Sequence, residues 1–288
     1  MFTNSNFYFG ALIMYERVLI LIDMEGVGGV VGEPYHGLSK GSEQWKIAVE
    51  QGIKEVNAAA EALFAKGVKK IGVWDNHGGS PNMDPSLLDP RVTYIIPDPA
   101  DPRLSFAKNE YDCVCFFGYH AMEGTLGGVL AHTMSSVSVQ YYKLNGKYIG
   151  EVDMDSYIAA EHGIPSVFFA AGDIACSQAK RILPHLMTVT TKKEISRNEA
   201  IFRDNESLLA DIKEQISYAV EVNAEAIKLT FPAKFEKSFK RVEDGAKYLS
   251  RLKARGISCN HPEDEILGRD AHTVVSTVNN MSEFIICI

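Results

Sequence analysis

Short apolar runs, separated by polar segments that contain glycine, dominate the first two thirds of the chain. Four runs place apolar residues at consecutive positions instead of alternating them, which is typical of strands buried on both faces of a parallel sheet. These runs cover residues 18–22, 71–74, 114–117 and 167–170, and a further run over residues 92–96 ends at a proline. The pattern therefore predicts a sheet of four or five parallel strands.

Helical periodicity appears between the strand signals. Over residues 42–66, apolar side chains such as Val56 and Leu63 keep the spacing of one helical face, and Gly67 is a natural stop for the helix. A second helix is predicted over residues 153–161. Because strands and helices alternate, the sequence predicts an α/β fold with a mostly parallel sheet and flanking helices.

The pattern changes twice in the second half of the chain. Residues 137–148 alternate apolar and polar side chains, and Asn145-Gly146 is a strong hairpin signal. From residue 192 onward the chain predicts a smaller α+β unit. Its predicted helices cover residues 199–221 and 243–254, and its predicted strands cover residues 226–232 and 273–277.

These patterns divide the chain into three parts. We expect an N-terminal extension over residues 1–16, of which the first thirteen are loosely held. An α/β domain is predicted over residues 17–191, and a smaller α+β C-terminal domain over residues 192–288.

The charge composition argues against some classes of binding partner. The chain has 288 residues, with 29 basic and 37 acidic side chains and a formal net charge of -8. Since no run of Lys or Arg stands out, nucleic acid and anionic membranes are not expected as partners. No apolar run approaches the ~20 residues of a membrane span. Five scattered cysteines and the lack of signal-peptide features predict reduced thiols in a cytoplasmic protein.

Carboxylates and histidines follow the predicted strands. Asp23 and Glu25 come after the first strand, His77 after the second and His120 after the third. In an open parallel sheet, ligands bind outside the carboxyl ends of the strands, and extended residues two apart point to one side. Carboxylate and imidazole together suit zinc or a similar divalent ion. The sequence therefore predicts a metal site at this edge of the sheet.

Two more residues extend this site. Glu151 follows Gly150 directly after the predicted hairpin, and His132 lies in a glycine-rich segment. Glu151 would bring the number of protein ligands to about five, which exceeds the usual three of a one-zinc catalytic site and suits two metals with a bridging carboxylate. A lone Asp after a strand is more often a helix cap, and a lone His is more often an ordinary polar residue. It is the coincidence of several such residues at one edge that favours a metal site.

Two classes of function are open for a two-metal site of this kind, namely hydrolysis, for example by a two-metal phosphoesterase, and peptide binding without catalysis. The phosphoesterase is disfavoured because no Arg or Lys cluster accompanies the motifs to hold a phosphate. Loss of His132 would separate catalysis from binding alone, since only hydrolysis would need it.

At these residues the chain resembles the zinc-dependent D-aminopeptidases of bacteria, some of which are associated with dipeptide transport. The resemblance runs from about residue 17 to about residue 222. The matching motifs are Asp23-Met24-Glu25-Gly26, Asp75-Asn76-His77, Gly118-Tyr119-His120-Ala121, His132-Thr133-Met134, Gly150-Glu151, Ala170-Ala171-Gly172-Asp173 and the stretch from Lys192 to Arg197.

The resemblance implies hydrolysis of short peptides with an N-terminal D-amino acid by a water that two zinc ions activate. In this family pattern Asp23 matches the bridging carboxylate, and His132 matches the catalytic residue, whose role as base, nucleophile or oxyanion stabiliser stays open. The resemblance also implies a ring-shaped homo-oligomer, typically a homodecamer. The remaining metal ligands it implies are Glu25, His77, His120 and Glu151.

Overall fold

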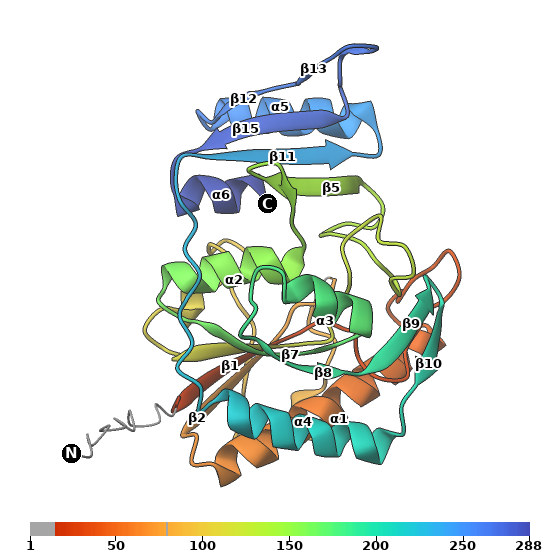
Figure 1. The fold of residues 1–288 in the computed structure, drawn as a ribbon, viewed down its shortest axis with the longest axis vertical. Helices are drawn as coiled ribbons and strands as arrows, with labels where there is room; N and C mark the ends of the chain where they lie inside the picture. Colours follow the sequence, from red (N-terminus) through yellow and green to blue (C-terminus); the bar gives the residue numbers. More distant parts are fainter. Residues whose placement is uncertain (1–14, 79) are drawn as a thin grey trace, which may run out of the picture.

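The computed structural model describes residues 15–78 and 80–288 (Figure 1). The loosely held segment expected over residues 1–13 lies outside the described residues. Among the described residues, none of the helices combines the length and the apolar character that a membrane span requires. All five cysteines are free thiols.

A six-stranded parallel sheet forms the larger part of the molecule, in the order β3-β2-β1-β4-β7-β8. It confirms the predicted parallel sheet and adds β8, which the sequence pattern did not reveal. The strands are β1 (Arg17–Ile22), β2 (Lys70–Asp75), β3 (Thr93–Ile95), β4 (Cys113–Phe117), β7 (Ser166–Ala171) and β8 (Met187–Thr190).

Both faces of this sheet are covered by helices, which explains the continuous apolar runs. Leu19 and Leu21 of β1 pack into one hydrophobic cluster, whereas Val18 and Ile20 pack into the other. Helices α1 and α4 cover the second cluster, and α2 and α3 cover the first (Figure 1). The helices are α1 (Glu43–Ala65), α2 (Glu151–Glu161), α3 (Asp173–Ala179) and α4 (Asn205–Ala219).

A smaller five-stranded sheet, in the order β12-β15-β11-β5-β6, lies beyond α2 (Figure 1). Every pairing in it is antiparallel. Together with its helices it forms the α+β part that the sequence predicted. The elements are β5 (Val139–Leu144), β6 (Lys147–Tyr148), β11 (Ala233–Phe239), β12 (Ser258–Asn260), β15 (Thr273–Val278), α5 (Val242–Ala254) and α6 (Met281–Cys287).

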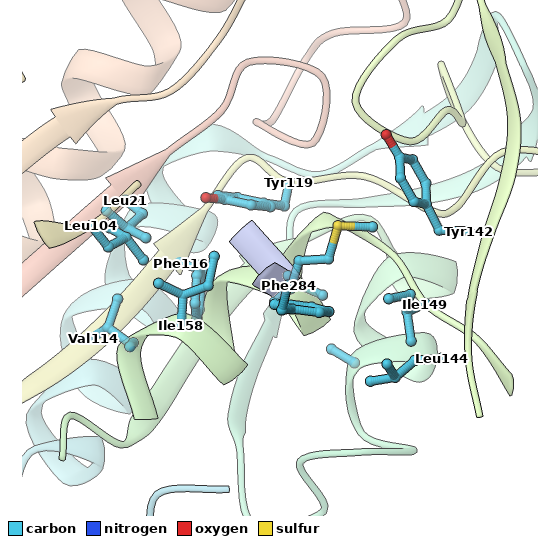
Figure 2. Packing of buried hydrophobic residues seen from close by; sticks show 14 of the residues in the cluster. Leu21, Leu104, Val114, Phe116, Tyr119, Tyr142, Leu144, Ile149, Ile158 and Phe284 are labelled. Carbon is cyan, nitrogen blue, oxygen red and sulfur yellow. The ribbon is translucent and has the colours of Figure 1, made fainter. Parts of the chain in front are cut away.

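The two sheets share one hydrophobic cluster. Phe116 of β4 and Ile158 of α2 belong to the same cluster as Tyr142 of β5 and Phe284 of α6 (Figure 2). The predicted hairpin does not belong to the parallel sheet. Its strand β5 pairs instead with β11, which is far away in sequence. The domain boundary at residue 191 stays a prediction.

Two details of the C-terminal half differ from the sequence prediction. The strand expected over residues 226–232 is wrong: this segment has no strand pairing and bends at residues 231 and 232, and the strand begins at Ala233. The helix expected from residue 199 begins at Asn205, because β10 (Glu199–Phe202) pairs with β9 (Lys192–Ser196) and Asp204 caps α4. The remaining strands of the described residues, β13 (Glu263–Asp264) and β14 (Gly268–Arg269), form a short antiparallel hairpin. Two 3-10 helices cover Pro85–Leu87 and Ser105–Ala107.

Candidate metal centre

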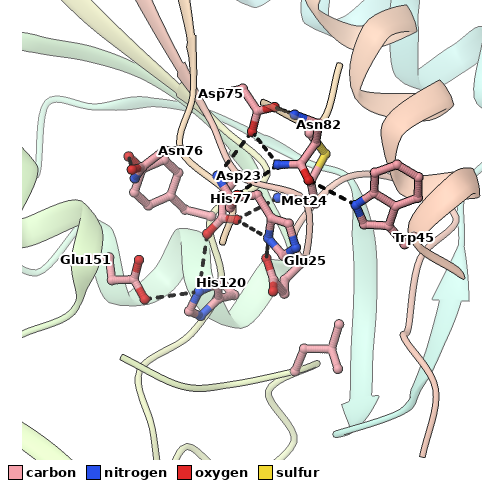
Figure 3. A network of polar contacts seen from close by, with 12 residues as sticks. Asp23, Met24, Glu25, Trp45, Asp75, Asn76, His77, Asn82, His120 and Glu151 are labelled. Atoms are coloured by element: carbon pink, nitrogen blue, oxygen red, sulfur yellow. Dashed lines mark hydrogen bonds and ion pairs between the residues drawn. The ribbon is translucent and has the colours of Figure 1, made fainter. Parts of the chain in front are cut away.

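The predicted ligands that follow three neighbouring strands lie at one edge of the sheet. β1 lies between β2 and β4, so the segments that follow these strands leave the sheet side by side. Asp23 and Glu25 follow β1, His77 follows β2, and His120 follows β4. The predicted convergence of these four residues is present in the structure, and their side chains point toward one another (Figure 3).

Two glycines allow the segments after β1 and β4 to touch. The Asp23 amide donates to the Phe117 carbonyl at 2.8 Å, and the Gly26 amide donates to the Gly118 carbonyl at 2.6 Å. A Cβ atom at Gly26 would lie 1.9 Å from the Tyr119 carbonyl oxygen, and one at Gly118 would lie 1.9 Å from the Asp23 carbonyl oxygen. Only glycine fits this close backbone contact.

Asp23, Glu25 and His77 form the first group of possible ligands. The Nδ1 atom of His77 lies 2.9 Å from Asp23 Oδ1 and 3.0 Å from Glu25 Oε2. The Asp75 carboxylate accepts hydrogen bonds from the backbone amide of His77 at 3.2 Å and from the backbone amide of Asn82 at 2.5 Å. Asp75 is therefore a turn residue and not a ligand.

His120, His132 and Glu151 form the second group. Glu151 Oε1 lies 3.4 Å from His120 Nε2 and 3.8 Å from His132 Nε2. Glu151 is the first residue of α2, which begins two residues earlier than the sequence predicted, and it accepts the Met134 amide at 2.7 Å. The structure thus places all six residues singled out in the sequence around one centre.

Asp23 joins the two groups. Its Oδ1 atom faces His77, while its Oδ2 atom lies 3.4 Å from His120 Nε2. A carboxylate whose two oxygens face different groups of donors has the arrangement that a bridge between two metal ions requires.

Backbone carbonyls fix the orientation of two imidazole rings. His120 Nδ1 lies 3.0 Å from the Ala121 carbonyl, and His132 Nδ1 lies 2.9 Å from the Leu130 carbonyl. In each ring the carbonyl therefore accepts a hydrogen bond from Nδ1–H, which leaves Nε2 as the nitrogen that faces the centre. The His120 Nε2 atom is buried without a hydrogen-bond partner in the described part of the chain. Such an atom, 3.4 Å from a carboxylate oxygen of Asp23 and 3.4 Å from one of Glu151, fits a metal ion.

The buried charges of the centre shift one another's pKa. Burial alone would raise the pKa of Asp23, but the imidazole rings of His120 and His77 beside it hold the pKa well below the usual value. Burial alone would lower the pKa of His77, but Glu25 and Asp23 raise it to about 11. Burial would also raise the pKa of Glu151, and the positive charge of His120 outweighs this and lowers it. The carboxylates of Asp23 and Glu151 are therefore ionised and can bind cations.

A buried lysine holds the segment that carries Glu25. Lys192 Nζ donates to the carbonyls of Glu25 at 2.6 Å, Val27 at 3.0 Å and Val30 at 2.6 Å. Its side chain is fully buried, and burial lowers its pKa to about 8. Sequence reasoning included Lys192 in a matching motif but gave it no role, because nothing in the local pattern connects it with residue 25.

Strand β9 and Arg197, the residue that follows it, also hold the loop of His132. Glu194 Oε1 accepts the Val129 amide at 2.7 Å, the Arg197 carbonyl accepts the Leu130 amide at 2.9 Å, and Arg197 Nη1 donates to the Ala131 carbonyl at 2.8 Å. The stretch from Lys192 to Arg197 thus supports both a candidate ligand and the candidate catalytic residue.

A cleft of about 930 Å³ opens over the centre and is lined by Asp23, Glu25, His77, His132 and Glu151. Three cationic side chains also line it, namely Arg103, Arg197 and Lys240. No basic cluster is visible beside the motifs in the sequence, because these three residues are far from one another along the chain and only the fold brings them to the cleft.

Comparison with known proteins assigns the chain to a family. Residues 16–253 match the model of the D-aminopeptidase family, Peptidase M55. The D-aminopeptidase of Bacillus subtilis (strain 168) is 25% identical over 184 residues, which cover 63% of this chain and 65% of that relative. The matched segment is thus slightly less than two thirds of the relative's length.

A solved structure has the same fold. The Zn-dependent D-aminopeptidase DppA from Bacillus subtilis, described as a self-compartmentalizing protease, superposes with a TM-score of 0.79 at 21% identity. The superposition covers 93% of this chain and 94% of that chain. Because the family match spans most of the sequence, the chain belongs to the D-aminopeptidase family.

Proposed function

We propose that this protein is a zinc-dependent aminopeptidase that hydrolyses short peptides with an N-terminal D-amino acid. The observation that carries the proposal is the junction of two donor groups at Asp23, whose oxygens face His77 on one side and His120 on the other. Membership of the D-aminopeptidase family supports the reaction and the stereochemistry.

Two zinc ions per subunit are proposed for this centre. Asp23 would bridge them, with Glu25 and His77 on the first ion and His120 and Glu151 on the second. When bound, the zinc pair supplies Lewis acidity toward water and toward the carbonyl of the scissile bond. The donor set of carboxylate oxygens and imidazole nitrogens suits zinc.

His132 is proposed as the catalytic group. The Leu130 carbonyl holds the proton on Nδ1, so Nε2 has a lone pair beside the cleft. A neutral ring in this tautomer can accept a proton as general base or attack as nucleophile, whereas stabilising an oxyanion would require a proton on Nε2. The geometry therefore favours the first two of the three roles that the sequence left open.

The cleft is suited to the ends of a short peptide. Carboxylates at its base attract the free amine of a substrate, which gives selectivity for the N-terminus. Neither a two-metal phosphoesterase nor a peptide-binding protein is favoured, given the family of the chain.

We further propose a ring-shaped homo-oligomer, a decamer in its simplest form, in the cytoplasm. The description of DppA as self-compartmentalizing supports assembly, since a peptidase of broad specificity benefits from enclosure. Light scattering on the purified protein should give a mass many times 31.8 kDa, and an active monomer would contradict this part of the proposal.

The activity is tested with matched D- and L-aminoacyl dipeptides and zinc-loaded, metal-free and reloaded protein. We expect cleavage of the D-series, loss of activity on chelation, and recovery with zinc. Equal activity in the metal-free protein, or no cleavage of any dipeptide by the loaded protein, would refute the proposed function.

A further inference from the structure

A hydrogen-bonded network links the metal centre to Arg103. Asn76 Nδ2 donates to the Tyr119 hydroxyl at 3.0 Å, and this hydroxyl donates to Asp155 Oδ2 at 2.7 Å. Arg103 closes the network, with Nε 2.5 Å from Asp155 Oδ1 and Nη2 2.8 Å from Asp155 Oδ2.

Each inner member of this network is tied to a candidate ligand. Asn76 precedes His77, and Tyr119 precedes His120. Asp155 lies four residues after Glu151 on α2, and thus about one turn along the same helical face. The position of Arg103 is therefore fixed relative to the metal centre by three separate elements.

The guanidinium of Arg103 has two edges that can bind a carboxylate, and Asp155 occupies only one. Asp155 takes the edge formed by Nε and Nη2, while Nη1 forms no hydrogen bond with any residue that the structure describes. Arg103 lines the cleft, and its guanidinium carbon lies 4.9 Å from the centroid of the Trp74 ring. The edge formed by Nη1 and Nη2 is thus available to a ligand in the cleft, on a side chain that is already held in place.

The other two cations of the cleft are less suited to this role. Lys240 Nζ donates to the Ser136 carbonyl at 2.7 Å and lies 3.4 Å from Glu123 Oε1. Arg197 is exposed, and it supports the His132 loop through Ala131.

We propose that Arg103 is a specificity residue that binds the free C-terminal carboxylate of a dipeptide whose amino end lies at the metal centre. The inference rests on the proposed peptidase function and narrows its substrate class. The rise along α2 from Glu151 to Asp155 is about 6 Å, which is commensurate with the ~7 Å span of two extended residues. A substrate with a neutral C-terminal amide would lose the charge-assisted hydrogen bonds to Arg103.

The test compares alanylglycine with alanylglycinamide, each with the N-terminal configuration that the enzyme cleaves. Wild-type zinc-loaded protein should prefer the acid over the amide by roughly 10- to 100-fold in kcat/KM. Removing Arg103 alone would leave Asp155 buried without its counter-charge, so the informative variant is Arg103→Leu combined with Asp155→Asn. It should lose that preference, chiefly through a higher KM for the acid, with little change for the amide.

Two control variants isolate the guanidinium. Asp155→Asn alone keeps Arg103 and should keep a preference for the acid. Lys240→Met removes a different cation of the cleft and should also keep the preference. Zinc content, measured by elemental analysis, should be the same in all four proteins.

A binding measurement keeps the inference independent of catalysis. Calorimetry with a dipeptide whose scissile amide is replaced by a methylene-amine should show tighter binding of the acid than of its amide, and the double variant should bind both alike. Equal affinities in the wild type would overturn the proposal for Arg103 whether or not the protein is a peptidase. An equal loss for acid and amide in the double variant would also overturn it, because Arg103 would then have only a structural role.

Discussion

The imidazole rings of His120 and His132 stack with their centroids 3.8 Å apart and their planes within 11° of parallel. The His132 amide also donates to the Ala121 carbonyl at 3.2 Å, so the two loops are joined beside the rings. Both Nε2 atoms lie near the same Glu151 oxygen. The two imidazole rings therefore lie side by side, although we propose different roles for them: metal binding for His120 and catalysis for His132.

The first prediction concerns His132→Ala. Because His132 is proposed to act on protons and not to hold a metal, the variant should keep both ions while its rate falls by about 10²–10⁴. Elemental analysis and kinetics at several zinc concentrations check this. Loss of one ion, with activity restored by excess zinc, would show that His132 is a ligand.

Glu151→Ala should have the opposite signature. The variant loses a charged oxygen donor on the second ion, so it should release one zinc per subunit on dialysis and recover part of its activity in excess zinc. Retention of both ions after dialysis, at a reduced rate, would argue that Glu151 acts in catalysis instead.

Asp23 and Glu25 should differ in how many ions depend on them. Asp23 faces both donor groups, whereas Glu25 contacts only His77 among the candidate ligands. Asp23→Ala should therefore lose both ions, while Glu25→Ala should lose one. The metal content of the two dialysed variants, compared side by side, checks the bridging role, and an equal loss in both variants would rule it out.

Lys192→Met tests the support of the Glu25 segment. Three backbone carbonyls lose their donor, which should lower the free energy of unfolding by about 3 kcal/mol and weaken zinc binding by roughly 10-fold. Lys193→Met, at the adjacent exposed position, is the matched control. Denaturant unfolding and zinc titration measure both effects, and zinc affinity equal to that of the control would contradict the positioning role.

Glu55→Gln tests the pH dependence of stability. Glu55 is fully buried and accepts the Gly28 amide at 2.8 Å, and burial raises its pKa from its usual value of 4.5 to about 7. Between these two pH values the folded state binds more protons than the unfolded state, so this residue lowers the free energy of unfolding as the pH rises from about 4.5 to 7, by at most about 3 kcal/mol.

Glutamine keeps the acceptor for Gly28 without the buried charge. The variant should therefore unfold at a higher denaturant concentration than the wild type at pH 8 and show little difference at pH 4.5. Parallel denaturant titrations at the two pH values measure this. Identical pH dependence in the two proteins would mean that Glu55 does not titrate in this range.

The sequence by itself determined the parallel sheet and the candidate ligands. The apolar runs were readable because strands covered by helices on both faces need apolar side chains at every position, as Leu19 and Ile20 show by packing into different clusters. The ligands were readable because parallel strands end at one edge, which places Asp23, His77 and His120 together whatever the details of the loops.

The tertiary structure alone decided what depends on contacts between distant segments. The segment over residues 226–232 has an apolar composition suited to a strand, but it does not pair with any strand of the described residues. Because a strand is defined by its pairing, composition alone could not decide this. For the same reason, the sequence could not predict that strand β5 of the hairpin pairs with β11. Lys192 beside the Glu25 segment and Arg103 beside Asp155 are likewise joined by hydrogen bonds across 167 and 52 positions. No local periodicity encodes such partners, since their proximity arises only when the layers of the fold pack together.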